Sequence, residues 1–134
     1  MDSVSTSAVR RLQEVLDRFE AKDIDGVIDL FAADGVLVDP HYPPPIGPAM
    51  AGHNTIRDGL TWGLGMLEQP GVSVRHRLSD PGDGRVAAVE VDTNHRLVGG
   101  ATIAFPQLFV AEVGDDGLLR RMQSYTPYPP PAMP

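Results

Sequence analysis

The chain has 134 residues, of which 42% are hydrophobic and 22% charged. This composition predicts one globular domain that buries enough apolar surface to fold unaided. Eleven Lys and Arg against 18 Asp and Glu give a formal net charge of −7, which repels phosphates, so we expect no nucleic acid and no membrane as a partner. The absence of cysteine excludes disulfides and thiolate ligands. The opening residues lack a secretory signal pattern, and we expect a cytoplasmic protein.

Two helices are predicted at the start of the chain, because apolar residues recur there every three or four positions. The first begins at a hydroxyl residue between positions 5 and 7, which can cap it, and ends near Lys22. Asp23 can cap a second, shorter helix, which we expect to include Phe31 and to stop at Gly35. Each helix carries one apolar face.

A short strand, a proline-rich loop and a third helix are predicted next. Residues 36–39 are rich in β-formers, and the proline that follows ends the strand and keeps Asp39 extended. Five prolines between residues 40 and 48 exclude helix and central strand there. The third helix is expected from residue 54 or 55 up to residue 70.

Long strands are predicted over the second half of the chain, joined by glycine-rich turns that suit antiparallel hairpins. Helices followed by such strands predict an α+β fold, a cone-shaped barrel in which three N-terminal helices pack on a curved, mostly antiparallel sheet around an internal pocket. We expect one domain over residues 1–126 and a proline-rich tail over residues 127–134. The predicted strands cover residues 72–78, 85–97, 102–113 and 118–126.

Two segments of the chain resemble a known superfamily. Residues 21–40 read AKDIDGVIDLFAADGVLVDP, and Ala51-Gly52-His53 is followed by Ile56-Arg57. This order of helix, turn, strand ending in Asp-Pro and further helix is similar to the nuclear transport factor 2-like superfamily and, within it, to ketosteroid isomerases and SnoaL-like polyketide cyclases. The resemblance extends to about residue 126 and implies the same fold. The activity stays open, because this fold hosts enzymes, binders and scaffolds.

The resemblance also implies roles for individual residues. The general base of ketosteroid isomerases corresponds to Asp39, and the two oxyanion donors of that family correspond to Gln107 and to Val15, which cannot donate. Limonene epoxide hydrolase is a second relative by resemblance. Its general acid corresponds to Asp92, and Glu90 stands where it has an orienting arginine. Polyether epoxide-opening cyclases use a carboxylate pair, one member of which also corresponds to Asp39.

Asp39 is a candidate catalytic residue on its own chemistry as well. It shares a strand face with Leu37, so both side chains point the same way. A carboxylate that faces a pocket can take a proton from a bound molecule. The competing interpretation is a turn aspartate that accepts hydrogen bonds from backbone amides of the proline-rich loop.

Glu90, Asp92 and Asn94 share one face of their predicted strand. The alternation taken alone favours a solvent-facing polar side, with Val89 and Val91 facing the core. If the outer side of the sheet pairs with a second subunit, the valines instead lie in a dimer interface and the polar residues line the pocket. We expect this second arrangement, a homodimer through the outer sheet face, because both family alignments direct Asp92 inward.

Other residues are predicted to line the pocket. Gln107 lies on an otherwise apolar strand face, where it orients the substrate or is a satisfied core amide. His41, two residues after Asp39, is either a proton carrier at the pocket mouth or a loop residue. For the remaining predicted lining residues, ordinary core packing or a solvent position is the alternative: Val15, Trp62, Met66, Asn94, Phe109, Met122 and Ser124.

These residues predict a cofactor-independent acid–base enzyme that acts on a small, largely apolar polyketide-, terpenoid- or steroid-like molecule. Asp39 is expected to be the base, Asp92 or Glu90 the acid or its tuning partner, and Gln107 the orienting donor. Isomerisation, cyclisation and epoxide opening all fit this set. The histidines show no paired ligand spacing, so we expect no metal and no other cofactor. The alternative is a non-catalytic domain of the same fold that binds a small ligand or another protein.

Overall fold

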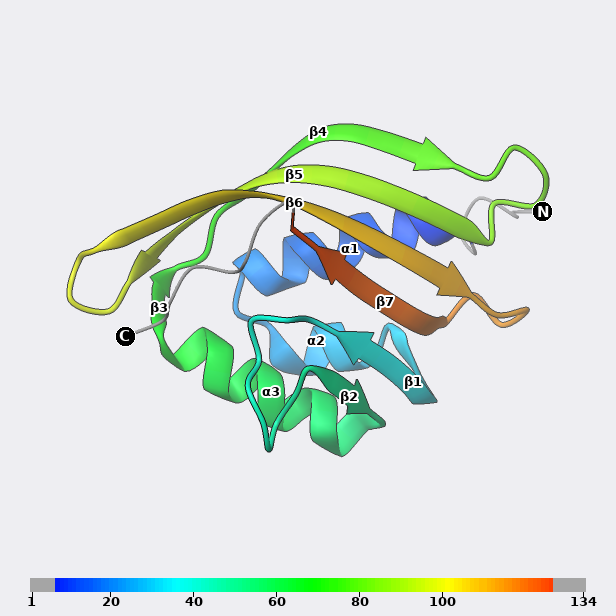
Figure 1. The fold of residues 1–134 in the computed structure, drawn as a ribbon. Coiled ribbons are helices and arrows are strands. Elements are labelled where there is room, and N and C mark those ends of the chain that lie inside the picture. Colours follow the sequence, from blue (N-terminus) through cyan, green and yellow to red (C-terminus); the bar gives the residue numbers. More distant parts are fainter. Residues whose placement is uncertain (1–6, 127–134) are drawn as a thin grey trace.

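Three helices lie on the inner side of one strongly curved sheet (Figure 1). The computed structural model describes residues 7–126, so the tail predicted over residues 127–134 and the alternative helix caps at positions 5 and 6 lie outside the described residues. The elements in chain order are α1 (Ala8–Glu20), α2 (Ile24–Ile28), β1 (Phe31–Val38), β2 (Ala49–Ala51), α3 (His53–Gly65), β3 (Leu67–Gln69), β4 (Val72–Ser79), β5 (Val86–Leu97), β6 (Thr102–Val113) and β7 (Leu119–Tyr125).

Both predicted N-terminal helices form, and each begins at a capping residue. The Ser7 hydroxyl accepts a hydrogen bond from Arg10 N at 3.3 Å. At the start of α2, Asp23 Oδ1 accepts one from Gly26 N at 2.9 Å. These caps satisfy amide groups that the first helical turn leaves without an internal partner. The buried apolar side of α1 contacts β4, β5 and β6.

Helix α2 ends earlier than predicted, because Phe31 and Gly35 belong to β1. Phe31 pairs with Leu119 of the parallel strand β7. Gly35 is a point of close packing rather than a helix stop, since a Cβ there would lie 2.7 Å from the Leu119 carbonyl oxygen. Strand pairing between distant segments therefore overrides the local helical periodicity.

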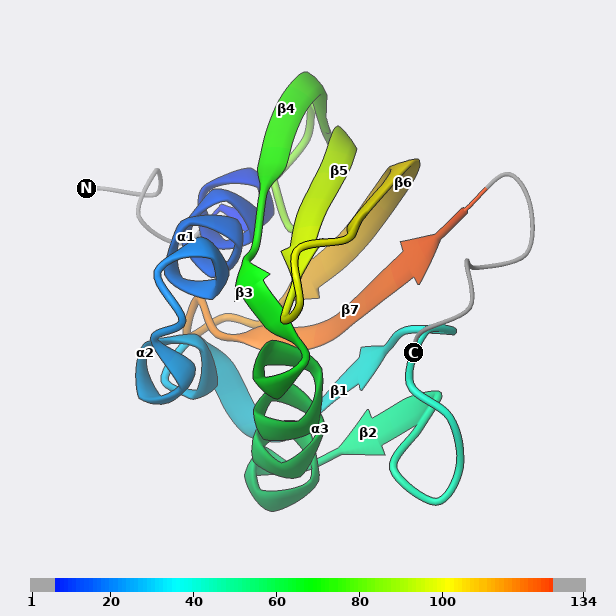
Figure 2. The same cartoon turned by 90° about the vertical axis from the view of Figure 1, so that its left-hand side faces the viewer.

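The sheet has the strand order β2-β1-β7-β6-β5-β3, and β4 also pairs with β5. Only the β1–β7 pair among these described strands is parallel. The short strands β2 and β3 are missing from the sequence-based prediction, because three residues carry too little periodicity to be recognised. Pairing of β3 with β5 also ends α3 at Gly65, before the predicted end. Figure 2 shows α1 alongside β4 and β5, and α3 next to β2 and β3.

Strand β5 turns its apolar side toward the helices. Val89, Val91 and Thr93 are fully buried, whereas Glu90 is half-buried and Asp92 is exposed on the opposite face. The expectation that the acidic face lines the interior is therefore wrong, and the argument for a dimer interface built on the two valines loses its basis. The strand follows the simple alternation of polar and apolar residues, because burying two carboxylates without partners costs free energy, whereas burying two valines is favourable.

The orientation of β5 predicts unequal effects of two neighbouring substitutions. Val91→Ala leaves a cavity in a fully buried position, and we expect it to lower the free energy of unfolding by about 2 kcal/mol. Asp92→Ala removes an exposed carboxylate whose ion pair with Arg75 is weak, and we expect a change below about 0.5 kcal/mol. Urea unfolding followed by circular dichroism measures both values. A larger loss in Asp92→Ala would contradict this orientation.

Candidate functional site

A cavity of about 850 Å³, its open mouth included, lies between the concave side of the sheet and the helices. Every helix and most strands contribute to its wall. The wall is mainly apolar, and typical lining side chains are Val15, Phe19, Phe105, Phe109 and Met122.

Asp39 follows the last residue of β1 and lines this cavity. Its Oδ1 accepts two hydrogen bonds from His41, one from the backbone N at 2.9 Å and one from Nδ1 at 2.7 Å. The backbone N of Asp39 donates to the Pro48 carbonyl at 2.9 Å, which ties the residue to the far end of the proline-rich loop. Asp39 therefore organises the loop through Oδ1, while Oδ2 has no partner among the described residues.

The ring of His41 is held in place. It packs on Phe105 with 4.8 Å between ring centroids, and only 11% of its side chain is exposed. Its Nε2 is buried and has no hydrogen-bond partner within residues 7–126. Because Nε2 is covered, the polar atom that this pair offers to the cavity is Oδ2 of Asp39, and His41 orients that carboxylate.

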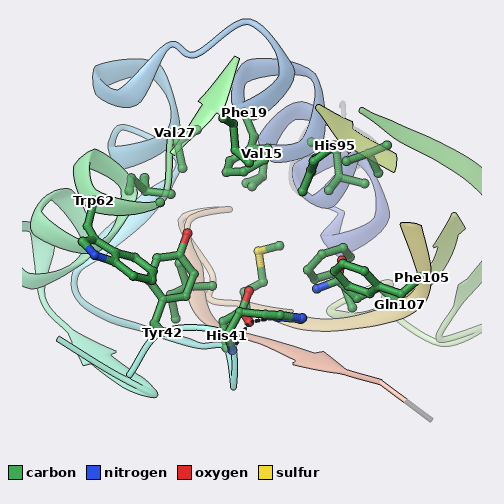
Figure 3. A pocket seen from close by; sticks show the side chains of 18 of the residues that line it. Val15, Phe19, Val27, His41, Tyr42, Trp62, His95, Phe105 and Gln107 are labelled. Carbon is green, nitrogen blue, oxygen red and sulfur yellow. Dashed lines mark hydrogen bonds and ion pairs between the residues drawn. The ribbon is translucent and has the colours of Figure 1, made fainter. Parts of the chain in front are cut away.

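Tyr42 points its hydroxyl into the cavity (Figure 3). The buried ring packs on α3 at Gly63, where a Cβ would lie 2.7 Å from the hydroxyl oxygen, and beside Trp62 with ring centroids 5.5 Å apart. Burial, and after it the negative charge of Asp39, raise the pKa of Tyr42 well above its usual value. The hydroxyl therefore stays protonated and can donate a hydrogen bond to a bound molecule.

His95 lies on the inner face of β5 and also lines the cavity. Its Nδ1 accepts a hydrogen bond from Gly71 N at 3.0 Å, so the neutral ring carries its proton on Nε2. Burial is the main cause that lowers the pKa of His95 to about 4; the charge of His41 acts in the same direction and Asp39 opposes it. At neutral pH the ring is uncharged, and Nε2–H is a donor.

Gln107 on β6 belongs to a buried row of three polar side chains. Its Oε1 accepts a hydrogen bond from Thr93 Oγ1 at 2.7 Å, and its Nε2 donates to Ser124 Oγ at 2.6 Å. An amide nitrogen carries two hydrogens, and Ser124 takes one of them. Gln107 lines the cavity, and its second amide hydrogen has no partner among the described residues.

This arrangement of fold and cavity agrees with comparisons with known proteins. The family model of the SnoaL-like domain matches residues 12–122. The chain belongs to the SnoaL-like domain family. No curated protein matches the chain.

Several solved structures resemble this SnoaL-like domain in fold. Rv0760c from Mycobacterium tuberculosis, in complex with estradiol-17β-hemisuccinate, is 18% identical over 88% of this chain and 92% of its own, with a TM-score of 0.77. Δ5-3-ketosteroid isomerase from Mycobacterium sp. is 18% identical over 87% and 90%, with a TM-score of 0.77. TerC, co-crystallised with polyporic acid, is 19% identical over 88% and 89%, with a TM-score of 0.72. At these identities the likeness concerns the fold.

The SnoaL-like domain brings together many of the residues predicted to form its pocket. Ser124 is buried behind Gln107 and does not line the cavity. Met66 follows the last residue of α3 and Asn94 lies on the outer face of β5, so the predictions that they line the pocket are wrong. The predicted residues that do line it are Val15, Asp39, His41, Trp62, Gln107, Phe109 and Met122.

The two predicted acidic partners of Asp39 lie outside the cavity. On the outer face of the sheet, Glu90 Oε1 lies 2.7 Å from His76 Nδ1, and Asp92 lies 3.5 Å from Arg75. The prediction that they share a pocket with Asp39 is wrong, because their strand presents its other face to the helices. Among residues 7–126, Asp39 is the only carboxylate that lines the cavity.

Tyr42 and His95 are polar lining residues that the sequence analysis missed. His95 shares the alternation of Val91 and Thr93, so a consistent choice of the apolar face of β5 places it inside. Tyr42 lies in a loop, where no periodicity marks a buried side chain. Its burial depends on the room that Gly63 leaves on a helix farther along the chain.

The described part of the chain offers no ready metal site. No group of three or more His, Asp or Glu side chains in residues 7–126 is arranged to hold a metal ion.

None of the helices in this range is long and apolar enough to cross a membrane. The polar groups described above are one carboxylate, its orienting histidine and three uncharged donors.

The state of His95 predicts how acid affects stability. Its pKa of about 4 in the folded state lies below the ~6.5 of an unfolded histidine, so the unfolded chain takes up a proton first as pH falls. The stability that neutral His95 contributes is therefore lost between about pH 6.5 and pH 4. We expect His95→Asn, which keeps an acceptor for Gly71 N, to show a weaker fall over this range in urea unfolding. An equal fall in His95→Asn and in the wild type would contradict this assignment.

Proposed function

We propose that this SnoaL-like domain is a cofactor-independent acid–base enzyme that moves a proton on a small, largely apolar carbonyl compound. The observation that supports it is the single carboxylate with an unpartnered oxygen in a mainly apolar cavity that also contains uncharged donors. Asp39 is the base in this proposal. Tyr42 and Gln107 are the donors that bind the carbonyl oxygen.

The reaction begins when Oδ2 of Asp39 takes a proton from the carbon next to the carbonyl. The electron pair of that C–H bond forms a C=C bond, and the carbonyl π electrons move to oxygen, which becomes an enolate. Hydrogen bonds from Tyr42 and Gln107 stabilise the charge on that oxygen. In a β,γ-unsaturated ketone the enolate is conjugated with the second C=C bond, and return of the proton from Asp39 to the γ-carbon shifts that bond and completes an isomerisation. In a cyclisation, the enolate carbon instead attacks a second carbonyl carbon of the same molecule, and the alkoxide that forms takes the proton from Asp39.

Proton transfer at carbon fits the cavity better than epoxide opening by a carboxylate pair. That second reaction needs an acid beside the base, and Glu90 and Asp92 lie on the outer face. A neutral, apolar substrate is favoured because no Lys or Arg among the described residues lines the cavity. An anionic substrate would meet the charge of Asp39 with no cation to offset it.

Asp39→Asn tests the assigned base. The amide keeps an acceptor for His41 but cannot take a proton, so we expect exchange of the α-hydrogens of bound cyclic ketones in D₂O to slow by about 10²–10⁴-fold. Proton NMR measures the exchange. Binding is followed by the fluorescence of Trp62, the only tryptophan in the chain and a lining residue; the ketones should still bind.

Asp92→Asn is the matched control, because this carboxylate is exposed on the outer face, and its exchange rate should equal that of the wild type. Wild-type exchange in Asp39→Asn would disprove the assignment. Tight binding of ketones by the wild type without any exchange would support the alternative, a domain that only binds its ligand.

Tyr42→Phe tests the oxyanion donor. The hydroxyl has no protein partner among residues 7–126, so its removal should leave stability within about 0.5 kcal/mol of the wild type. The exchange rate should fall by about 10²–10³-fold, the usual effect of losing one donor to an oxyanion. Tyr125→Phe, at an exposed position, should change neither. Equal exchange rates in Tyr42→Phe and the wild type would remove Tyr42 from the reaction.

A further inference from the structure

We propose that His95 determines substrate specificity by donating a hydrogen bond from Nε2 to a second oxygen of the substrate, remote from the reacting carbonyl. The substrate class is then an uncharged molecule with an apolar body and an oxygen function at each end, such as a diketone or a hydroxyketone. The assignment of the reacting end rests on the proposed function. The assignment of the remote end rests on His95 and its surroundings.

The position of His95 is built by the backbone of a neighbouring segment. Gly71, between β3 and β4, donates its N–H to His95 Nδ1 at 3.0 Å, and its carbonyl accepts a hydrogen bond from Asn94 N at 2.9 Å. A Cβ at Gly71 would lie 2.4 Å from the Asn94 carbonyl oxygen, so only glycine fits there without a shift. The Phe19 ring lies against the imidazole, with ring centroids 5.9 Å apart.

This contact also selects the tautomer of His95. A protonated Nδ1 would bring its own hydrogen against the N–H of Gly71, so the bond requires an unprotonated Nδ1. The remaining ring hydrogen is then on Nε2. That atom has no hydrogen-bond partner among the described residues, and His95 lines the cavity. A ligand oxygen in the cavity can accept a hydrogen bond from this donor.

The two polar ends of the cavity lie apart. Figure 3 shows His95, Phe19 and Val15 in the upper part of the view, across the open space from His41 and Tyr42. The remaining lining is mainly apolar, with Gln107 as a further polar group. A molecule that satisfies both ends must therefore carry its oxygens at opposite ends of an apolar body.

The charges around the cavity restrict the second function to an uncharged oxygen. No Lys or Arg among residues 7–126 lines the cavity, so a carboxylate, sulfate or phosphate at the His95 end would stay unbalanced. A cationic amine is the competing ligand, because Asp39 is negative and the rings of Trp62 and Phe105 line the same space. The experiment below includes it.

The test compares ketones that differ in one oxygen. The probes are a decalin monoketone with its matching diketone, a steroid monoketone with its matching diketone, and an aminodecalin as the cation. Quenching of Trp62 fluorescence gives each Kd. With the better-fitting skeleton, we expect the wild type to bind the diketone about tenfold more tightly, the effect of one added hydrogen bond. In His95→Asn this preference should fall below about twofold, while the monoketone Kd stays unchanged.

Controls separate this inference from the proposed function. His76→Asn, on the exposed outer face, should keep the tenfold preference. His95→Asn should still exchange the α-hydrogens of the bound monoketone, because Asp39 and Tyr42 are intact. A preference lost in His95→Asn without exchange in any variant would support the role of His95 and refute the proposed function.

Three results would overturn the inference: equal Kd values for monoketone and diketone on both skeletons, a diketone preference that survives in His95→Asn, or tighter binding of the amine than of either diketone. The first of these is measured on the wild type alone, so it does not depend on how the variant folds. Exchange by the wild type together with equal Kd values would leave the proposed function standing and remove the role of His95.

Discussion

The hydrogen bonds from His41 to Asp39 are the constraint on which the candidate site depends. A carboxylate just after a strand would otherwise turn to solvent or use both oxygens for loop amides. Here both bonds go to Oδ1, and Phe105 holds the His41 ring, so the orientation of the Asp39 carboxylate is fixed. A general base needs a fixed orientation, because a misplacement of ~1 Å lowers the rate of proton transfer. The bond from Asp39 N to Pro48 makes the proline-rich loop part of this support.

The curvature of the sheet decides which groups share the cavity with that carboxylate. The inner faces of β5 and β6 contribute His95 and Gln107, which are both uncharged, whereas Glu90 and Asp92 stay on the outer face with cationic partners or histidine. A second carboxylate inside would raise the cost of ionising Asp39. With one negative charge and several neutral donors, the cavity is suited to stabilise the anion that forms when a proton leaves a neutral molecule.

Local patterns predict the fold well but only part of the site. Strand β6 spans the residues predicted for it, because an alternating pattern twelve residues long defines both of its ends. Asp39 and Gln107 are recognisable, one by its position before a proline and one as an amide on an apolar face. Tyr42 is not, since its burial depends on Gly63 on a distant helix. Glu90 lies on the outer face, because the alternation within its own strand decides which way its side chain points, whatever its counterpart in a related family does.

Two glycines that take no part in the chemistry decide where the donors lie. Gly63 leaves the space that the Tyr42 hydroxyl occupies, and Gly71 brings a backbone N–H against His95. A side chain at either position would displace a donor from its place in the cavity. Ligand preference in such a cavity therefore depends on how closely the backbone at these glycines packs against the donor residues, as much as on the donor side chains themselves. Two chains with the same donor residues but different residues at these glycine positions would place those donors differently around the same ligand.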